Sequence, residues 1–305
     1  MQLSIVTTLY SSSPYIEEFY KRIVKSASGI VEDFEIIFVN DGSPDDALEV
    51  AVELHQKDER VRVIDLSRNF GHHKAIMTGL SYARGENIFL IDVDLEEEPE
   101  LLSEFWNTFH EHEQLDVVYG VQLSRKGGWF ERLSGYLFYK VFNYISDFPL
   151  PVNFLTVRLM SKRYVKQLNT YDERVMSFSI LTELVGFKGA PISVNKKDTG
   201  RTTYTFGKKL SLLAELITST STKPLKWIFV SGFIVALISA IFIVKVVLIK
   251  LFSGGAMEGW SSLIVSLWFI GGVTMMSLGV VGIYLSQIFT EVKKRPNSII
   301  RKFYF

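Results

Sequence analysis

Residues 88–100 read Ile-Phe-Leu-Ile-Asp-Val-Asp-Leu-Glu-Glu-Glu-Pro-Glu, an apolar run that ends in acidic residues. The run Ile88–Ile91 is typical of a buried strand, and the later proline favours the start of a helix. Asp92 and Asp94 would follow the strand directly, where alternate side chains share a face. Such a pair of carboxylates suits a hard divalent cation, Mg²⁺ or Mn²⁺, which in turn neutralises a diphosphate. The alternative is a solvated acidic turn, which Glu96–Glu98 partly fit.

The same alternation of apolar runs and helical patterns extends over residues 1–120. In Pro14–Ser28, apolar residues recur at the spacing of one helix face. Strands that alternate with helices predict right-handed βαβ units and a mostly parallel, Rossmann-like sheet in an α/β domain. Such sheets bind ligands at the carboxyl ends of their strands. The predicted strands are Leu3–Leu9, Glu35–Val39, Val61–Leu66, Ile88–Ile91 and Val117–Tyr119.

Two other polar turns follow predicted strands. Asp41 lies in an Asn-Asp-Gly-Ser turn, where it could accept hydrogen bonds from a base or a ribose, although Asp-Gly is also ordinary turn chemistry. Ser43 in the same turn predicts a helix N-cap. Arg68 follows the third strand and could meet a phosphate at a helix N-terminus. We interpret the adjacent His72 and His73 as turn residues, because no other metal ligands stand at a suitable spacing.

Composition narrows the class of protein. The chain has 305 residues with 33 basic and 33 acidic side chains, and the lack of a basic excess argues against nucleic acid as a partner. Cysteine is absent, which excludes disulfides and thiolate metal sites and fits a reducing compartment. Hydrophobic residues make up 48% of the chain and are spread unevenly.

Two apolar runs near the C-terminus, Trp227–Leu251 and Ser261–Phe289, are each long enough to cross a hydrocarbon core of about 30 Å. Basic residues precede the first run and follow the second, at Lys223, Lys226 and 293–295. The positive-inside rule then predicts a multi-pass protein with its N-terminal domain in the cytoplasm. Buried helices of a soluble domain are the alternative, but two adjacent runs of this length rarely fit a domain of this size.

Two further segments, 129–146 and about 208–222, carry apolar residues at helical spacing. The first predicts either a helix that packs on the core or a helix that lies at the membrane interface. The second begins with Lys208 and Lys209 and predicts an amphipathic helix beside the membrane.

Together these motifs resemble family 2 glycosyltransferases with the GT-A fold. The branch that they resemble comprises polyprenyl-phosphate glycosyltransferases such as dolichol-phosphate mannose synthase and the bacterial prophage glucosyltransferases that act on undecaprenyl phosphate. The likeness covers nearly the whole chain and keeps the order of the motifs. They are Val39-Asn40-Asp41-Gly42-Ser43, Ser67-Arg68-Asn69-Phe70-Gly71, Asp92-Val93-Asp94-Leu95 with Pro99-Glu100, Arg158-Leu159-Met160-Ser161 and the two apolar runs followed by Lys293-Lys294-Arg295-Pro296.

The resemblance implies roles for residues of the donor site. Asp41 would contact the nucleoside, and Arg68 would support the diphosphate. Asp92 would take part in binding both the nucleotide and the metal. Asp94 and Glu96 would complete the ligands of Mg²⁺ or Mn²⁺.

The resemblance also implies catalytic and acceptor residues. Asp92 and Asp94 with Arg158 would be catalytic, and the arginine would screen charge between phosphates. Arg201, Tyr204 and Lys208 would bind the acceptor phosphate. For these three, a basic stretch attracted to anionic lipid is the alternative.

The chain departs from the pattern of its relatives at several positions. Thr7–Ser11 replaces a Pro-x-Tyr-Asn-Glu-like turn, and Glu96 stands where relatives usually have Gln. Asn153 and Thr156 stand where relatives often have Asp, so a carboxylate proposed there as a base is missing. A phosphate monoester with a second pKa of about 6 is already nucleophilic at neutral pH, so a phosphate acceptor does not need that base.

We therefore expect an inverting glycosyltransferase of the bacterial inner membrane that moves a sugar from a nucleotide-diphosphate sugar to a polyprenyl phosphate, undecaprenyl phosphate in particular. Transfer to a lipid-linked saccharide or a polysaccharide hydroxyl is one alternative, and a non-catalytic membrane scaffold is another. Relatives of this kind often form homo-oligomers. The expected layout is a GT-A domain over 1–205, an amphipathic helix over 206–226, membrane helices over 227–251 and 261–289, and a cytoplasmic tail over 290–305.

Overall fold

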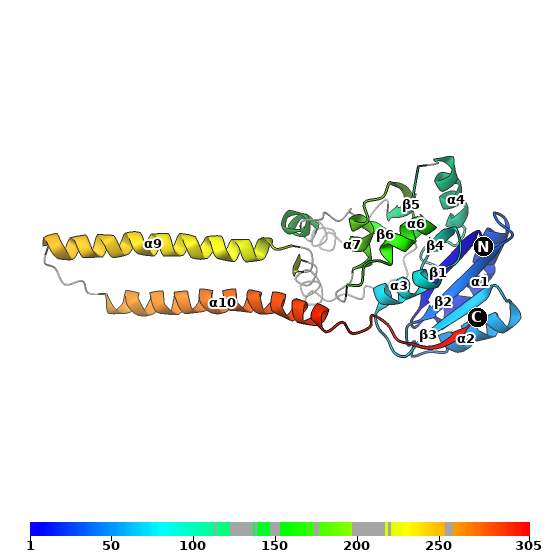
Figure 1. The fold of residues 1–305 in the computed structure, drawn as a ribbon, viewed down its shortest axis with the longest axis horizontal. Coiled ribbons are helices and arrows are strands. Elements are labelled where there is room, and N and C mark those ends of the chain that lie inside the picture. The colour runs from blue at the N-terminus through cyan, green and yellow to red at the C-terminus, as the bar shows by residue number, and fades with distance from the viewer. Residues whose placement is uncertain are drawn as a thin grey trace.

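The structure is a computed structural model, and it describes residues 1–112, 114–122, 137, 139–146, 153–173, 177–196, 217–218, 221–253 and 259–305. Within these ranges, an eight-stranded sheet carries helices on both faces, and two long helices extend away from it (Figure 1). The α/β class predicted from the sequence is confirmed.

The sheet has the strand order β7-β5-β6-β4-β1-β2-β3-β8. Its central strands β3, β2, β1 and β4 are parallel, as the alternating pattern predicted. Strand β6 runs antiparallel to both β4 and β5, and β7 runs parallel to β5. The strands are β1 Leu3–Leu9, β2 Phe34–Asn40, β3 Val61–Leu66, β4 Asn87–Leu90, β5 Val117–Gln122, β6 Phe154–Ser161, β7 Gly189–Val194 and β8 Ile300–Tyr304.

The helices cover the sheet in two layers. Helices α1, α2 and α4 pack on one face of the strands, and α3, α6 and α7 pack on the other. The N-cap predicted at Ser43 is wrong, because α2 begins only at Ala47, and Ser43 instead donates a hydrogen bond to Asp45. The helices are α1 Ser13–Ser28, α2 Ala47–Lys57, α3 His72–Tyr82, α4 Leu101–Glu111, α6 Lys162–Leu168, α7 Phe178–Leu184, α9 Lys223–Ser253 and α10 Trp260–Val292.

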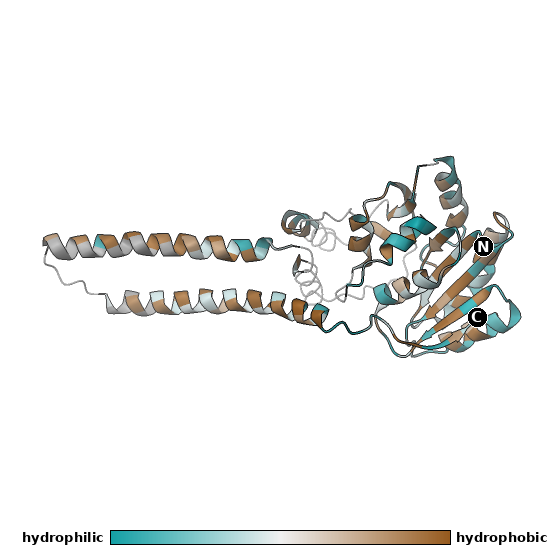
Figure 2. Ribbon diagram, viewed as in Figure 1, coloured by the Kyte–Doolittle hydropathy of each residue, from teal (hydrophilic) through white to brown (hydrophobic). Residues whose placement is uncertain are grey.

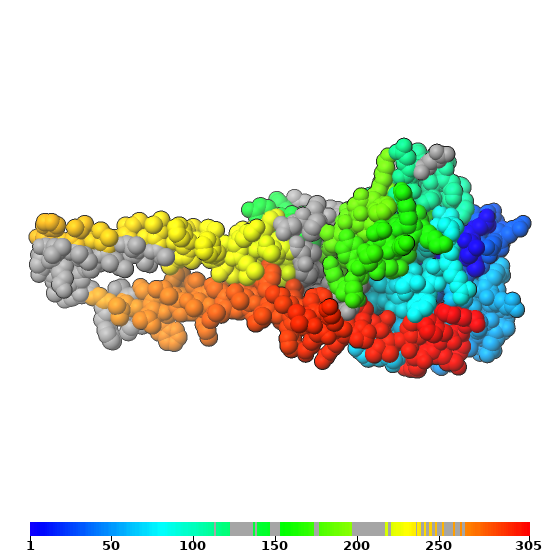
Figure 3. Space-filling model, viewed as in Figure 1, coloured from blue at the N-terminus to red at the C-terminus, as the bar shows by residue number. Residues whose placement is uncertain are grey.

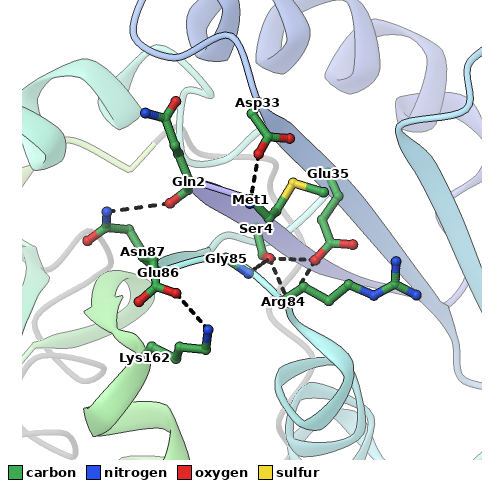
Figure 4. Close-up of polar contacts among 10 residues, drawn as sticks. All are labelled: Met1, Gln2, Ser4, Asp33, Glu35, Arg84, Gly85, Glu86, Asn87 and Lys162. Carbon is green, nitrogen blue, oxygen red and sulfur yellow. Dashed lines mark hydrogen bonds and ion pairs between the residues drawn. The ribbon is translucent and has the colours of Figure 1, made fainter.

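A buried polar network closes the amino-terminal end of the sheet (Figure 4). The Ser4 hydroxyl donates to Glu35 at 2.6 Å, and the backbone N–H of Arg84 donates to the same carboxylate at 2.8 Å. The Gly85 N–H donates to Ser4 Oγ at 2.8 Å. Arg62 compensates the buried charge of Glu35 with an ion pair of 2.7 Å. These groups are occupied with one another, so the ligand-binding end is the opposite, carboxyl end of the strands.

Helices α9 and α10 lie side by side and extend far beyond the sheet (Figures 1 and 3). Many of their described hydrophobic side chains are exposed, and much of their coloured ribbon is hydrophobic (Figure 2). In the part of the chain that the structure describes, one stretch, Ser266–Val292 of α10, is long and apolar enough to cross a membrane, with a hydropathy of 1.7. The other predicted span, 227–251, lies within α9, and its insertion into a membrane stays a prediction.

The predicted amphipathic segments are only partly within the described residues. Residues 139–145 are helical, and Phe142 is fully buried against Ile180 and Ile217, as expected for a helix that packs on the core. Tyr144 in the same helix is 73% exposed. The second predicted segment, 208–222, lies mostly outside the described residues.

The C-terminal residues do not form a simple tail. The chain returns from α10 to the domain, and β8 adds to the edge of the sheet antiparallel to β3 (red in Figure 1). The end of the chain is thereby part of the α/β domain, a feature that the predicted layout lacked.

Candidate active site

Three loops that carry the predicted residues meet at the carboxyl edge of the sheet. The register pairs Leu9 of β1 with Asn40 of β2, and Asn40 with Asp65 of β3, so these strands end at the same level. Strand β4 lies on the other side of β1 and runs in the same direction. The loops after β2, β3 and β4 therefore open on one edge, as the sequence predicted.

The acidic loop after β4 holds Asp92 and Asp94 in a half-buried position. Asp94 Oδ1 accepts a hydrogen bond from the Glu96 N–H at 3.0 Å, and Leu95 between them has a φ of 60°. Burial raises the pKa of Asp94, and the negative charges of Asp92 and Glu96 raise it further. Crowded carboxylates of this kind gain stability from a bound cation, so the pair fits Mg²⁺ or Mn²⁺.

Glu96 does not join this pair. Its carboxylate forms an ion pair of 2.8 Å with Lys196, which follows β7. Among the residues that the structure describes, no group of three or more His, Cys, Asp or Glu side chains is arranged to hold a metal. The predicted set of Asp92, Asp94 and Glu96 is therefore not assembled, because Lys196 neutralises the third carboxylate.

Glu97, which the sequence interpretation did not single out, is the most buried acid of the loop. Its side chain is about 1% exposed, and Lys196 Nζ lies 3.5 Å from Oε1. Neither carboxylate oxygen has a hydrogen-bond partner in the described part of the chain. Burial, followed by the charge of Asp92, raises the pKa of Glu97 to about 8. Nothing in the run Glu96–Glu98 indicates from the sequence that its middle residue is buried.

Arg158 lies behind the acidic loop on β6. It pairs with Leu90 of β4, two residues before Asp92. Its guanidinium is buried, donates to the carbonyl oxygens of Thr156 and Leu155 at 3.0 and 2.9 Å, and lies 4.6 Å from the Phe178 ring centre. Burial lowers the pKa of Arg158 to about 10, so the group remains a cation at neutral pH. Its charge can stabilise the carboxylates from within the protein.

Asp41 is buried, and both of its carboxylate oxygens accept hydrogen bonds from another loop. The donors are the backbone N–H groups of Phe70 at 2.7 Å and Gly71 at 3.0 Å. Burial raises the pKa of Asp41, and these two hydrogen bonds oppose the rise. Asp41 thus holds the loop that carries Arg68. The sequence did not indicate this contact, because the two motifs are far apart along the chain.

The loop 67–71, called the Arg68 loop below, also packs closely on Gly42. A Cβ added to Gly42, whose φ is +61°, would lie 2.5 Å from the carbonyl carbon of Arg68. Arg68 itself is exposed, donates to the Asn69 carbonyl oxygen at 3.0 Å and lies 4.1 Å from the centre of the Phe70 ring. Its guanidinium is available at the open edge where we predicted a diphosphate.

His72 belongs to the site, although we interpreted it as a turn residue. Its Nε2 lies 3.5 Å from Asp92 Oδ1, and its Nδ1 lies 3.1 Å from Thr8 Oγ1. The imidazole therefore connects the end of β1, the start of α3 and the acidic loop. The signal in the sequence was a histidine at the first position of a helix that follows the Arg68 loop.

Other predicted residues lie elsewhere or outside the described chain. Asn153 has a φ of 64° and donates to the Gln122 carbonyl oxygen at 3.3 Å, so it shapes the turn before β6. The predicted acceptor residues Arg201, Tyr204 and Lys208 lie outside the described residues.

Comparisons with known proteins agree with this architecture. Glucosyl-3-phosphoglycerate synthase from Mycobacterium tuberculosis, solved with Mn²⁺, UDP and phosphoglyceric acid, has a TM-score of 0.50 at 16% identity over 71% of this chain and 78% of its own. At that identity the likeness concerns the fold alone.

Sequence relatives are closer. A Mycobacterium tuberculosis relative is 48% identical over 304 residues, which cover 100% of this chain and 89% of the relative. The prophage bactoprenol glucosyl transferase homolog of Escherichia coli K12 is 32% identical, with 99% of both chains covered. The family model of glycosyl transferase family 2 matches residues 4–179. The chain therefore belongs to glycosyl transferase family 2 and is a glycosyltransferase with the α/β fold of that family.

Proposed function

We propose that this glycosyltransferase moves a sugar, with inversion, from a nucleotide-diphosphate sugar to a polyprenyl phosphate at the cytoplasmic face of the inner membrane. The observation that carries the proposal is the acidic pair, Asp92 and Asp94, at the open edge of a domain joined to a long apolar helix hairpin. The full-length likeness to a bactoprenol glucosyl transferase homolog supports a polyprenyl phosphate as the acceptor.

The donor would bind across the carboxyl edge of the sheet. Asp92 and Asp94 would hold Mg²⁺ or Mn²⁺, which neutralises the charge of a departing diphosphate. Arg68 would donate hydrogen bonds to the diphosphate, while Asp41, whose carboxylate is buried, would keep the Arg68 loop in place beside the nucleoside. The structural neighbour solved with Mn²⁺ and UDP supports a donor of this class.

The acceptor phosphate would attack without a protein base. At neutral pH a phosphate monoester with a second pKa of about 6 is largely anionic. The need is then for positive charge near the two phosphate groups. The buried Arg158 would contribute to it from within the protein, and Arg201 and Lys208 would supply it at the acceptor, where Tyr204 would donate a hydrogen bond. Asn153 and Thr156, which stand where relatives often have Asp, are compatible with such a reaction.

The hairpin would bring this site to the bilayer. Helix α9 starts at the domain, and the chain after α10 returns to the domain as β8, so both outer ends of the hairpin are on the domain side. This arrangement supports two membrane-spanning helices and a multi-pass topology, in which the domain and the 290–305 segment would lie on the cytoplasmic face.

Product analysis tests the proposal. Purified full-length protein is incubated with undecaprenyl phosphate, Mn²⁺ and a panel of UDP-, GDP- and dTDP-sugars, and the lipid product is weighed by mass spectrometry. We expect one acid-labile lipid-phosphate monosaccharide, its loss with a chelator, and its loss in Asp94→Asn with the fold retained. Transfer only to a lipid-linked saccharide would favour the hydroxyl-acceptor alternative, and binding without any transfer would favour a scaffold.

A further inference from the structure

The chain that follows α10 contacts the Arg68 loop directly. Residues 293–299 lead from the helix to the domain, and 300–304 form β8 along β3 (Figures 1 and 3). The Ser67 N–H donates to the Ile299 carbonyl oxygen at 2.8 Å. The Ser67 carbonyl oxygen accepts a hydrogen bond from Arg301 Nη2 at 2.7 Å. Both backbone polar groups of the residue before Arg68 are therefore held by the C-terminal segment.

Further contacts fix this segment on either side of Ser67. Arg301 Nη1 lies 3.6 Å from Asp65 Oδ2, so the same guanidinium spans the end of β3 and the start of the loop. Ser298 Oγ lies 2.7 Å from Thr78 Oγ1 of α3. The segment therefore joins β3, the Arg68 loop and α3, the three elements that frame this side of the site.

The far end of the segment is anchored as well. The Phe305 ring centre lies 3.6 Å from the Arg62 guanidinium carbon, and Arg62 is the ion-pair partner of the buried Glu35. Tyr82 at the end of α3 contacts Phe303, with ring centres 5.1 Å apart. These aromatic contacts hold β8 against the domain, so Arg301 has a fixed base from which to reach Ser67.

The Arg68 loop is thus held from two sides. Asp41 and Gly42 hold its later residues, and the C-terminal segment holds its first residue. A loop that is ordered before its ligand arrives loses less conformational entropy when the ligand binds, so the ligand binds more tightly.

We propose that Arg301 is a positioning residue of the donor site, which holds Ser67 so that residues 68–71 are preformed to receive the diphosphate of the donor. The inference rests on the proposed function, because it takes the Arg68 loop as the place where the diphosphate binds. It also implies that α10 and the donor site are physically joined by a short ordered segment.

The test uses the full chain with three substitutions: Arg301→Ala, Arg301→Lys and, as the matched control, Lys302→Ala. Lys302 is the next residue of β8, and its Nζ lies 4.5 Å from the Tyr304 ring centre. Affinity for UDP, GDP and dTDP with Mn²⁺ is measured by calorimetry, and donor KM and kcat are measured with the sugar that the wild type uses. Hydrogen exchange of the peptide spanning 66–72 is measured without any ligand.

For Arg301→Ala we expect about five- to tenfold weaker nucleotide binding and a matching rise in donor KM, with kcat changed less than twofold. Exchange in 66–72 becomes faster, Arg301→Lys restores part of both effects, and Lys302→Ala behaves as the wild type. A fall in kcat with KM unchanged, or equal losses in Arg301→Ala and Lys302→Ala, would overturn the proposal.

The two proposals fail in different ways. If the wild type binds no nucleoside diphosphate and transfers no sugar, the proposed function is wrong. The exchange measurement then still reports whether Arg301 holds the loop around Ser67. If the wild type binds nucleotide and Arg301→Ala binds it equally well with unchanged exchange in 66–72, the positioning role is wrong while the proposed function stands.

Discussion

At the scale of single residues, we expect His72 and its neighbour His73 to differ in their effect on metal-dependent activity. Partners that orient metal-binding carboxylates typically contribute 10- to 100-fold to affinity or activity. Since His72 Nε2 lies 3.5 Å from Asp92, we expect His72→Ala to lower kcat by about tenfold and to raise the Mn²⁺ concentration needed for half-maximal activity. The measurement is a Mn²⁺ titration of the transfer rate.

His73→Ala is the control for this prediction. The pKa of His73 is lowered to about 4, first by desolvation and then by the charges of His72 and Arg158, so His73 is neutral at pH 7. We expect its loss to change the Mn²⁺ titration by less than twofold. Equal effects of the two substitutions would show that His72 has no special relation to Asp92.

Glu97 makes stability depend on pH. Its pKa is raised from 4.5 to about 8 in the folded protein, first by burial and then by Asp92. A carboxyl group with a raised pKa contributes stability that is complete below the unfolded pKa and is lost as pH rises through the folded pKa. We therefore expect Glu97→Gln to gain stability relative to the wild type between about pH 5 and pH 8, and to gain no more above that range.

Thermal unfolding of both proteins at several pH values, without a divalent cation, measures this difference. A stability difference that stays constant from pH 5 to pH 8 would mean that Lys196 keeps Glu97 ionised throughout, contrary to the prediction.

The individual residues of the site were only partly predictable. Asp92, Asp94 and Arg68 could be predicted because each lies within three residues of the end of a strand-like run, and strand ends of a parallel sheet meet at one edge. The contacts of Asp41 with Phe70 and Gly71 were hidden because they join residues about 30 positions apart. Glu96 and Glu97 look alike in the sequence, but in the fold Glu96 forms the closer ion pair with Lys196, at 2.8 Å, and Glu97 is the more buried, at about 1% exposed.

At the scale of elements, the close approach of α3 to the sheet supports the site. A Cβ on Gly79 would lie 2.5 Å from Val6 Cγ1 and 2.9 Å from Val39 Cγ2, both on buried strands. Gly79→Ala should therefore push α3, which begins with His72, away from the sheet and destabilise the fold by about 1–3 kcal/mol. Gly29→Ala is the control, because its Cβ would meet the Ser26 carbonyl oxygen at an ordinary 3.5 Å.

Denaturant unfolding of the two variants decides this prediction. If Gly79→Ala is as stable as Gly29→Ala, the helix has room to shift without loss, and the packing of α3 on β1 and β2 is looser than the contacts indicate.

Strands and helices could be predicted where the pattern of apolar residues along the chain was sufficient to define them. The strands β1, β2 and β3 are short, mostly apolar segments, and their bounds lie within a residue or two of the prediction. Strand β8 reads Ile-Arg-Lys-Phe-Tyr, and its exposed charges suit an edge strand as well as a tail. Only its pairing with β3, far away in the sequence, makes it a strand. Helix α2 starts later than its signals suggested because Asp45 accepts hydrogen bonds from Ser43 and Ser13 instead.

At the scale of the whole molecule, the exposed hairpin demands an apolar environment. None of the apolar window in Ser266–Val292 is buried, and Trp268 and Met275 are 79% and 73% exposed. Soluble monomers rarely expose apolar patches larger than several hundred Å². At 33 residues, α10 is about 50 Å long, which exceeds a hydrocarbon core of about 30 Å. A bilayer would cover such a surface, in agreement with the proposed function.

The absence of cysteine makes this topology directly testable with single cysteines. Gly259 precedes α10 at the far end of the hairpin, and Lys302 lies in β8 at the domain. If the hairpin spans the membrane with the domain inside, a membrane-impermeant maleimide added to intact cells labels Gly259→Cys. It labels Lys302→Cys only after permeabilisation, because β8 is bound to the cytoplasmic sheet. Labelling of Lys302→Cys in intact cells would place the domain outside. Protection of Gly259→Cys before permeabilisation would mean that the hairpin does not cross the bilayer, and the site would then need another route to a lipid acceptor.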